Sequence, residues 1–338
     1  MEKTVRRILG NYGLAEYSLL PVQRGYRNQS FAAQLSSGSV VNLMLYKREP
    51  GMLARIRRTN AVANFVADRG LPARRTCSEK IVRLSSARGE SYGALYEYLP
   101  GHTIPWEAYT MKHIKLLGKT MSDLHAALLP FDASGLPEVA DEYIVIVGRM
   151  RRYLMQGGVS RALAAKLQLA VPSGTLAQID GTLRACKVLP HQQALHMDFV
   201  RSNILFEGLD GELKITGILD FEKTANGNVL FDIARTLAFL LVDCKYKQPD
   251  KVRKYFLRSG YQKRGGADFQ NVTVKTKAGS IDVLEALLDV FLMYDFYKFL
   301  RHNPYESLLQ NGHFIRTRDI LLDRGLLVRP HVAQHTAQ

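Results

Sequence analysis

The stretch HMDFVRSNILFEGLDGELKITGILDFE, residues 196–222, decides how the central part of this chain folds. It holds two apolar runs on either side of Asp210-Gly211, a dipeptide that favours a two-residue turn between antiparallel strands. The sequence therefore predicts a β-hairpin whose two outer ends return to the same edge.

Polar side chains stand at both outer ends of this hairpin. Asp198 and Asn203 lie just before its first strand, and Asp220 and Glu222 lie just after its second. Carboxylate and amide oxygens without cysteines favour Mg²⁺, which takes one or two carboxylates together with substrate phosphate oxygens. For one acid alone, a turn hydrogen bond to the backbone is the more ordinary role. For the whole set around one hairpin, a divalent-cation site is the better interpretation.

The first hundred residues have the pattern of a small antiparallel sheet. Short apolar runs are separated by glycine-bearing turns, and one helical face closes at Gly70 with Pro72 beyond it. The expected elements are a helix within 1–15, strands within 17–47, a helix at 52–69 and strands at 80–86 and 91–101.

Helical periodicity dominates the rest of the chain. Residues 105–129 and 141–158 have the 3.6-residue period, and most of 232–329 is helical in pattern as well. We expect an α+β fold with a sheet-rich N-terminal lobe at 1–98 and a larger helical lobe at 99–338 that carries the hairpin.

Composition narrows the class of protein. The 338 residues are 46% hydrophobic and 23% charged, as in globular proteins, and the three cysteines form no CxxC pair. No stretch reaches the roughly 20 apolar residues that span a bilayer, and the N-terminus is too charged for a signal peptide. We therefore expect a cytoplasmic protein without a membrane partner. The net charge of +15 is dispersed without a nucleic-acid-binding motif, so no nucleic-acid partner is expected.

Three motifs in order carry a family resemblance. They are His196-x-Asp198-x-x-x-x-Asn203, then Asp220-Phe221-Glu222, then FDIARTL from Phe231. Together they resemble the catalytic core of the aminoglycoside phosphotransferase and choline kinase-like superfamily, small-molecule kinases with a protein-kinase-like bilobal fold. Upstream, RGYRNQSFAAQL at 24–35 is similar to the family's phosphate-covering loop, and ALYEYLPG at 94–101 is similar to its hinge.

The resemblance implies roles for the matching residues. Asp198 would accept or orient the proton of the acceptor hydroxyl, while Asn203 and Asp220 would hold Mg²⁺ ions that bridge the phosphates of ATP. Glu222 would help to ligate the second ion, with a solvated or capping acid as the equal alternative. The residues implied as supporting the site are His196 and Asp232.

The resemblance also places the nucleotide. The backbone at Glu97 and Leu99 would bind the adenine edge. Backbone N–H groups from Gly25 to Ser30 would cover the phosphates, with Asn28 bracing the turn.

The chain departs from the family pattern at the phosphate-gripping lysine. Alignment of VNLMLYKR on the relevant strand puts either Met44 or, with a shift, Lys47 at the lysine position. The following helix offers Thr59 and Asn60 where kinases have a glutamate. Lys47 shares a strand face with Leu43 and would point either into the cleft or into solvent.

The sequence thus favours an ATP- and Mg²⁺-dependent kinase that phosphorylates a hydroxyl of a small metabolite or antibiotic. Two other classes stay open. An atypical protein kinase is disfavoured because no Ala-Pro-Glu segment follows Asp220. A nucleotide-binding pseudokinase that serves as a scaffold stays open because the motifs do not assign the lysine and the glutamate.

Overall fold

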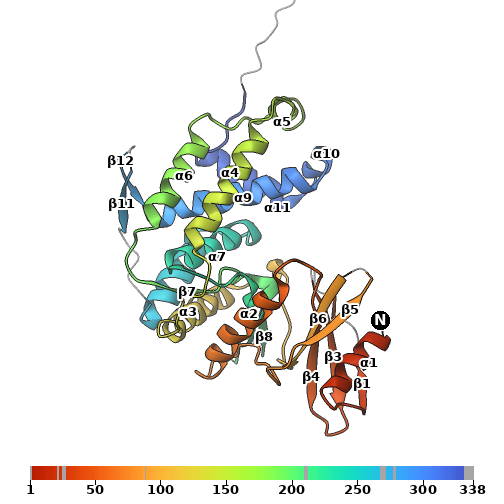
Figure 1. The fold of residues 1–338 in the computed structure, drawn as a ribbon. Helices are drawn as coiled ribbons and strands as arrows, with labels where there is room; N and C mark the ends of the chain where they lie inside the picture. The colour runs from red at the N-terminus through yellow and green to blue at the C-terminus, as the bar shows by residue number, and fades with distance from the viewer. Residues whose placement is uncertain are drawn as a thin grey trace, which may run out of the picture. The chain divides into compact units, whose positions relative to one another are not determined.

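The computed structural model describes residues 2–20, 23–24, 28–87, 89–208, 212–266, 272–276 and 279–330 (Figure 1). The chain packs into two compact units: Met1–Ile104 with Arg201–Thr224, and Pro105–Val200 with Ala225–Gln338. The segment that holds the hairpin therefore packs with the N-terminal residues. The predicted lobe boundary between residues 98 and 99 stays a prediction.

The first unit is built on an antiparallel sheet of order β1-β3-β4-β6-β5, with β2 paired to β3. Two helices belong to it, α1 (Glu2–Asn11) and α2 (Met52–Ala67). The strands are β1 (Tyr17–Leu19), β2 (Gln23–Arg24), β3 (Gln29–Leu35), β4 (Val40–Leu45), β5 (Val82–Ser86) and β6 (Gly89–Glu97). These elements confirm the expected sheet.

The two faces of β4 pack against different helices. Val41 and Leu43 belong to a core cluster with α1, whereas Met44 and Tyr46 belong to a second cluster with Met52 and Ile56 of α2. Successive strand residues point to opposite faces, which explains the division. The α2 face of the sheet is called the inner face below.

The predicted hairpin is present as β8 (Ile204–Glu207) and β9 (Lys214–Ile218), which pair antiparallel. Ile204 lies opposite Ile218, and the N–H of Leu219 donates to the carbonyl of Asn203 at 2.8 Å. The outer ends of the two strands therefore meet, as the sequence predicted. The predicted Asp210-Gly211 turn lies outside the described residues.

The second unit is mainly helical. In it α7 packs against α9, and α3 packs against the π-helical segment Lys254–Tyr261. The latter approach is close: a Cβ on Gly118 would lie 2.1 Å from the carbonyl oxygen of Phe256. The helices are α3 (Met111–Leu128), α4 (Val139–Leu154), α5 (Gly157–Ala162), α6 (Thr175–Cys186), α7 (Leu230–Asp243), α8 (Pro249–Arg253), α9 (Val283–His302), α10 (Tyr305–Leu308) and α11 (Gly312–Asp323). An α+β fold of the expected kind is confirmed.

Two small strand pairs were not predicted. β7 (Gln192–Leu195) pairs with β10 (Ala225–Asn228), and β11 (Thr273–Thr276) pairs with β12 (Gly279–Asp282). Each strand has four residues and lacks the apolar run that identified β8. The β7–β10 pair also joins segments about thirty positions apart, which no local signal reveals.

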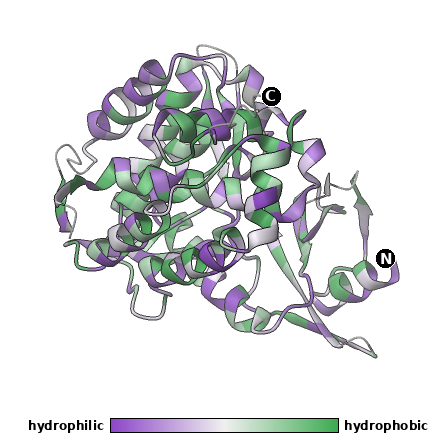
Figure 2. Cartoon of the chain, turned by 90° about the horizontal axis from the view of Figure 1, so that it is seen from above, coloured by the Kyte–Doolittle hydropathy of each residue, from purple (hydrophilic) through white to green (hydrophobic). Residues whose placement is uncertain are grey.

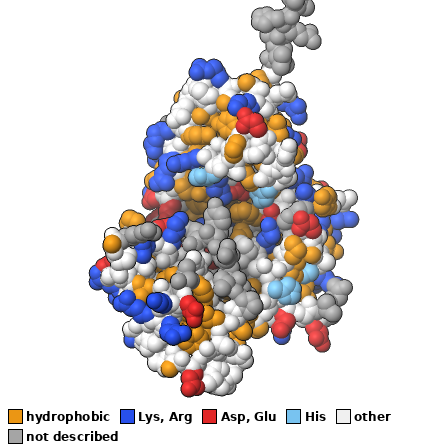
Figure 3. All heavy atoms as spheres, turned by 90° about the vertical axis from the view of Figure 1, so that its right-hand side faces the viewer, with side chains coloured by type: hydrophobic (Ala, Val, Ile, Leu, Met, Phe, Trp, Pro, Cys, Tyr) orange, Lys and Arg blue, Asp and Glu red, His pale blue; other side chains and the backbone are white. Residues whose placement is uncertain are grey.

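Hydrophobic and hydrophilic residues alternate along the helices, so most helices present one apolar side (Figure 2). Lys and Arg side chains are dispersed over the face that Figure 3 displays. Among the described residues, no helix combines the length and the apolar character that crossing a membrane requires.

Candidate active site

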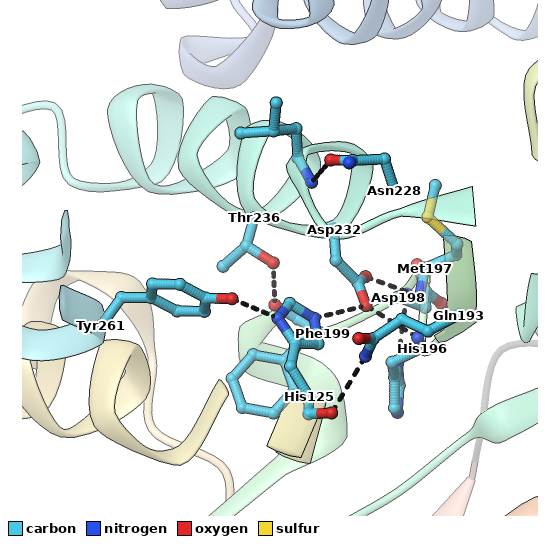
Figure 4. A network of polar contacts seen from close by, with 11 residues as sticks. His125, Gln193, His196, Met197, Asp198, Phe199, Asn228, Asp232, Thr236 and Tyr261 are labelled. Carbon is cyan, nitrogen blue, oxygen red and sulfur yellow. Dashed lines mark hydrogen bonds and ion pairs between the residues drawn. The ribbon is translucent and has the colours of Figure 1, made fainter. Parts of the chain in front are cut away.

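Asp232 fixes the turn that carries Asp198. Strand β7 ends at Leu195, and the next two backbone N–H groups, of His196 and Met197, each donate to one carboxylate oxygen of Asp232 at 2.7 Å (Figure 4). The turn is tight, since Met197 has a positive φ of 58°. A buried carboxylate that accepts two backbone bonds holds such a turn in one conformation.

Asp232 is itself held by a second layer of side chains. The Nε2 of His125 lies 3.2 Å from Asp232 Oδ2, and the Nδ1 of His125 lies 2.8 Å from the Tyr261 hydroxyl (Figure 4). Burial raises the pKa of Asp232, but the hydrogen bond and charge of His125 and the contribution of His196 outweigh it, so the pKa is lowered on balance. Asp232 therefore stays ionised.

His196 supports the turn from inside. Its side chain is fully buried, and its Nδ1 accepts the backbone N–H of Asp198 at 3.1 Å. Its ring also meets Phe199 edge-on, with centroids 5.9 Å apart. Since Nδ1 acts as an acceptor, the ring proton of the neutral form lies on Nε2.

The carboxylate of Asp198 forms a buried ion pair with Arg235. Arg235 Nη2 donates to Asp198 Oδ1 at 3.0 Å, and Nη1 donates to the hydroxyl of Tyr143 at 2.7 Å. Burial lowers the pKa of Arg235, but Tyr143, Asp198 and Asp295 raise it on balance, so the guanidinium stays charged. This cation orients the carboxylate.

Sequence reasoning missed Arg235. It lies in FDIARTL, three residues after Asp232 on α7, so both side chains are on the same side of the helix. That spacing was visible, but nothing local indicated that Asp198 would be its partner.

In the first unit, the hairpin register brings Asn203 and Asp220 to the same end. Asn203 ends a 3₁₀ turn before β8, and Asp220 follows β9 with a φ of 59°. The Oδ1 of Asp220 accepts the N–H of Glu222 at 3.3 Å. An amide oxygen and a carboxylate thus stand at adjacent ends of paired strands, whereas Asp198 belongs to the second unit.

Glu222 and Asn28 are joined. The Nδ2 of Asn28 donates to Glu222 Oε1 at 2.5 Å, and Asn28 Oδ1 accepts the backbone N–H of Lys47 at 3.1 Å. Asn28 thus links the start of β3 to the segment after β9. Among the other predicted phosphate-loop residues, Ser30 donates to Asn42 Oδ1 at 2.6 Å, and Gly25 lies outside the described residues.

The predicted hinge residues stand at the end of β6. Glu97 is its last residue, and its N–H donates to the carbonyl of Arg75 at 2.9 Å, which leaves only its carbonyl oxygen for an adenine base. Leu99 follows two residues later, partly buried and outside the strand. The adenine contacts stay a prediction.

The two candidates for the lysine position differ in environment. Met44 lies on the inner face with α2, and Lys47 is exposed beyond the end of β4. By the alternation of strand residues, Lys47 falls on the same side of the sheet as Leu43, and that side packs against α1. On the helix, Thr59 and Asn60 are both buried, with Asn60 accepting a hydrogen bond from Tyr96 at 2.8 Å.

Comparison with known proteins supplies the context for this geometry. The sequence model of the phosphotransferase enzyme family matches residues 18–260. The comparison with curated proteins found no match.

Solved structures share the fold at low identity. A microcompartment-associated aminopropanol kinase is 15% identical, with a TM-score of 0.66 over 96% of this chain and 99% of its own. The amicoumacin kinase hAmiN is 13% identical, with a TM-score of 0.65 over 94% and 96%. A macrolide 2'-phosphotransferase from Brachybacterium faecium is 14% identical, with a TM-score of 0.54 over 93% and 95%.

Proposed function

Because this chain belongs to the phosphotransferase enzyme family and is by that membership a small-molecule phosphotransferase, we propose that it transfers the γ-phosphoryl group of ATP to a hydroxyl of a small metabolite or antibiotic. One observation carries the proposal. The turn with Asp198 is held by two backbone bonds to a buried Asp232, and the carboxylate itself is held by Arg235. Such a rigid, buried carboxylate suits the orientation of a hydroxyl nucleophile.

Asp198 is the proposed base. It accepts the proton of the acceptor hydroxyl as the oxygen attacks the phosphorus, and the bond from phosphorus to the bridging oxygen of ADP breaks. Arg235 keeps the carboxylate aimed and ionised before the acceptor arrives. His196 and Asp232 act through the turn and touch no reacting atom.

Asn203 and Asp220 fit a Mg²⁺ ion by their chemistry. Both offer oxygen donors at adjacent strand ends, which is the ligand type that this ion prefers. Among the described residues, no group of three or more His, Cys, Asp or Glu side chains is arranged to hold a metal. A site that borrows phosphate oxygens and water needs no such group. When bound, the ion supplies positive charge that neutralises the phosphates during transfer.

Glu222 is proposed as a further ligand: Asn28 donates to its Oε1, and the carboxylate has lone pairs left for a cation. We propose that residues 1–98 bind the nucleotide and that 99–338 bind the acceptor. Glu97 and Leu99 would then bind the base, with Gly25, Asn28 and Ser30 over the phosphates.

A thermal-shift assay with ATP, with and without Mg²⁺, tests the nucleotide half of the proposal. Stabilisation that needs Mg²⁺ and disappears in Asp220→Asn is the expected result. Asp180→Asn is the matched control, because that carboxylate pairs with the exposed Arg184. Absence of any nucleotide effect in the wild-type chain would exclude the proposed activity.

The acceptor requires a screen of hydroxyl compounds coupled to ADP release. The similar solved structures are named as kinases of aminopropanol, amicoumacin and a macrolide, so amino alcohols and antibiotics come first. Transfer that is lost in Asp198→Asn, with nucleotide binding retained, supports the assigned base.

A pseudokinase scaffold is the second candidate. Met44, one of the two candidates for the lysine position, lies on the inner face, and this is the observation that favours it. Nucleotide binding without turnover across the whole acceptor screen would select it over the kinase.

A further inference from the structure

The inner face of the first unit carries a neutral hydrogen-bond network. The hydroxyls of Tyr46 and Tyr96 hydrogen-bond to each other, and Tyr96 donates to Asn60 Oδ1 of α2 at 2.8 Å. Burial raises the pKa of both phenols, so they are neutral at physiological pH. Strand β6 and helix α2 therefore meet through uncharged groups at a place where protein kinases join a lysine and a glutamate.

A buried cation stands beside this network. Arg74 is only 8% exposed, and its guanidinium carbon lies 4.2 Å from the centroid of the Tyr96 ring. Burial lowers its pKa, but Tyr46, Tyr96, Asp220 and Glu222 raise it on balance, so Arg74 is charged. The carboxylates of Asp220 and Glu222, proposed as Mg²⁺ ligands, thus stabilise the charge of this guanidinium.

The backbone around Arg74 is fixed from two sides. Ala73 forms a parallel bridge with Ile218, whose N–H donates to the carbonyl of Pro72 at 2.7 Å. On the other side, Arg75 accepts the N–H of Glu97 at 2.9 Å. Arg74 is therefore held between the strand that leads to Asp220 and the end of the predicted hinge strand.

The guanidinium has donors to spare. It carries five N–H groups, and among the residues that the structure describes none accepts a hydrogen bond from it. Its planar fork suits the paired oxygens of a phosphate, which bind guanidinium with two parallel hydrogen bonds.

We propose that Arg74 binds the nucleotide phosphates in place of the strand lysine. The phosphate-binding cation then lies in the segment between α2 and β5 and not on β4. The inference rests on the proposed function. The Tyr96 ring packs against the cation, and the Tyr46–Tyr96–Asn60 network takes the place of a lysine–glutamate ion pair. Asp220 and Glu222 attract the guanidinium, and a bound phosphate would replace part of that attraction.

Calorimetric titration of Mg-ADP, adenosine and Mg-tripolyphosphate tests this proposal. In Arg74→Met we expect affinity for Mg-ADP and tripolyphosphate to fall about 10- to 100-fold, since a charge-assisted phosphate contact is lost. Adenosine affinity should change less than about twofold, because no phosphate is involved. Arg83→Met is the matched control: Arg83 is exposed on β5 and pairs with Glu90, and its variant should bind like the wild type.

A second variant separates phosphate binding from packing. Met44→Lys combined with Arg74→Met returns a cation to the inner face and should restore Mg-ADP affinity at least about fivefold, which a purely structural Arg74 does not predict. Should Arg74→Met fail to fold by circular dichroism, Arg74→Gln is read by the same criteria. Mg-ADP binding within about twofold of wild type, or an equal loss for adenosine, overturns the proposal.

The results separate this inference from the proposed function. Arg74-dependent binding of Mg-ADP without phosphorylation of any acceptor supports the phosphate-binding role of Arg74 and contradicts the kinase activity. Phosphoryl transfer that is unchanged in Arg74→Met supports the kinase activity and contradicts the role of Arg74. A wild-type chain that binds neither Mg-ADP nor tripolyphosphate contradicts both proposals.

Discussion

Two buried regions of this chain treat charge in opposite ways. Around Asp198 the charges are paired: Arg235 pairs with the carboxylate, although its buried Nε has no hydrogen-bond partner among the described residues, and Asp232 is bonded by two backbone N–H groups and His125. On the inner face of the sheet in the first unit, the tyrosine network is neutral, and the buried cation Arg74 lies over the Tyr96 ring but donates no hydrogen bond to a described residue.

The difference between the two regions indicates which of them can form new hydrogen bonds to a ligand. Groups that already bond to one another hold a rigid conformation and have few hydrogen bonds left for a ligand. A buried cation that donates no hydrogen bond to a described residue can donate to an anion that arrives. We therefore expect mutations around Asp198 to affect turnover or folding, and mutations at Arg74 to affect nucleotide affinity.

The largest effect is expected for Asp198→Asn. The amide cannot accept the hydroxyl proton, so turnover should fall about 10³-fold while the affinity for Mg-ADP is retained. Steady-state ADP release and calorimetry measure the two quantities. The control is Asp141→Asn, whose carboxylate pairs with the exposed Lys187. Comparable loss of nucleotide binding would remove the distinction between the two regions.

The next effect concerns folding. Asp232→Asn leaves donors unpaired in a fully buried place, so the free energy of unfolding should fall by about 3 kcal/mol, as measured by urea denaturation. Because the folded-state pKa of Asp232 is lowered, its stabilisation is present above the usual carboxyl value of 3.8 and is lost as pH falls through the lower folded value. The gap between wild type and variant should therefore shrink below about pH 3.8. A constant gap at all pH values contradicts an ionised Asp232.

A smaller effect is expected for Arg235→Met. Loss of the neighbouring cation leaves Asp198 less well aimed, so turnover should fall about tenfold. Steady-state ADP release measures this turnover. Tyr143→Phe is the control: it removes one hydrogen bond to Arg235 and keeps the ion pair. Turnover of Arg235→Met equal to that of the wild type contradicts the orienting role.

The smallest effect is expected for Lys47→Met. This side chain is exposed beyond β4, so affinity for Mg-ADP should change less than about twofold. A tenfold loss of Mg-ADP affinity would indicate that Lys47 at the strand end binds the phosphates and would contradict the role proposed for Arg74. Calorimetry under the same conditions as for Arg74→Met makes the two variants directly comparable.

Much of the fold was predictable because its signals are local. The hairpin follows from two apolar runs, and the sheet of the first unit follows from alternating runs with glycine-bearing turns. The pairs β7–β10 and β11–β12 were missed because their strands lack an apolar run, and β7–β10 also depends on pairing between distant segments. Lys47 was kept as a candidate because the alternation of strand residues shows that it shares a face with Leu43. The alternation does not show which helix covers that face.

The sequence by itself determined the family, the hairpin and the order of Asp198, Asn203 and Asp220, because these depend on spacing along the chain. Only the tertiary structure decided which charges meet. Arg235 reaches Asp198 across 37 positions, and Arg74 stacks on Tyr96 from a different element. Such encounters depend on how side chains pack through space, so the spacing of residues along the chain does not reveal them.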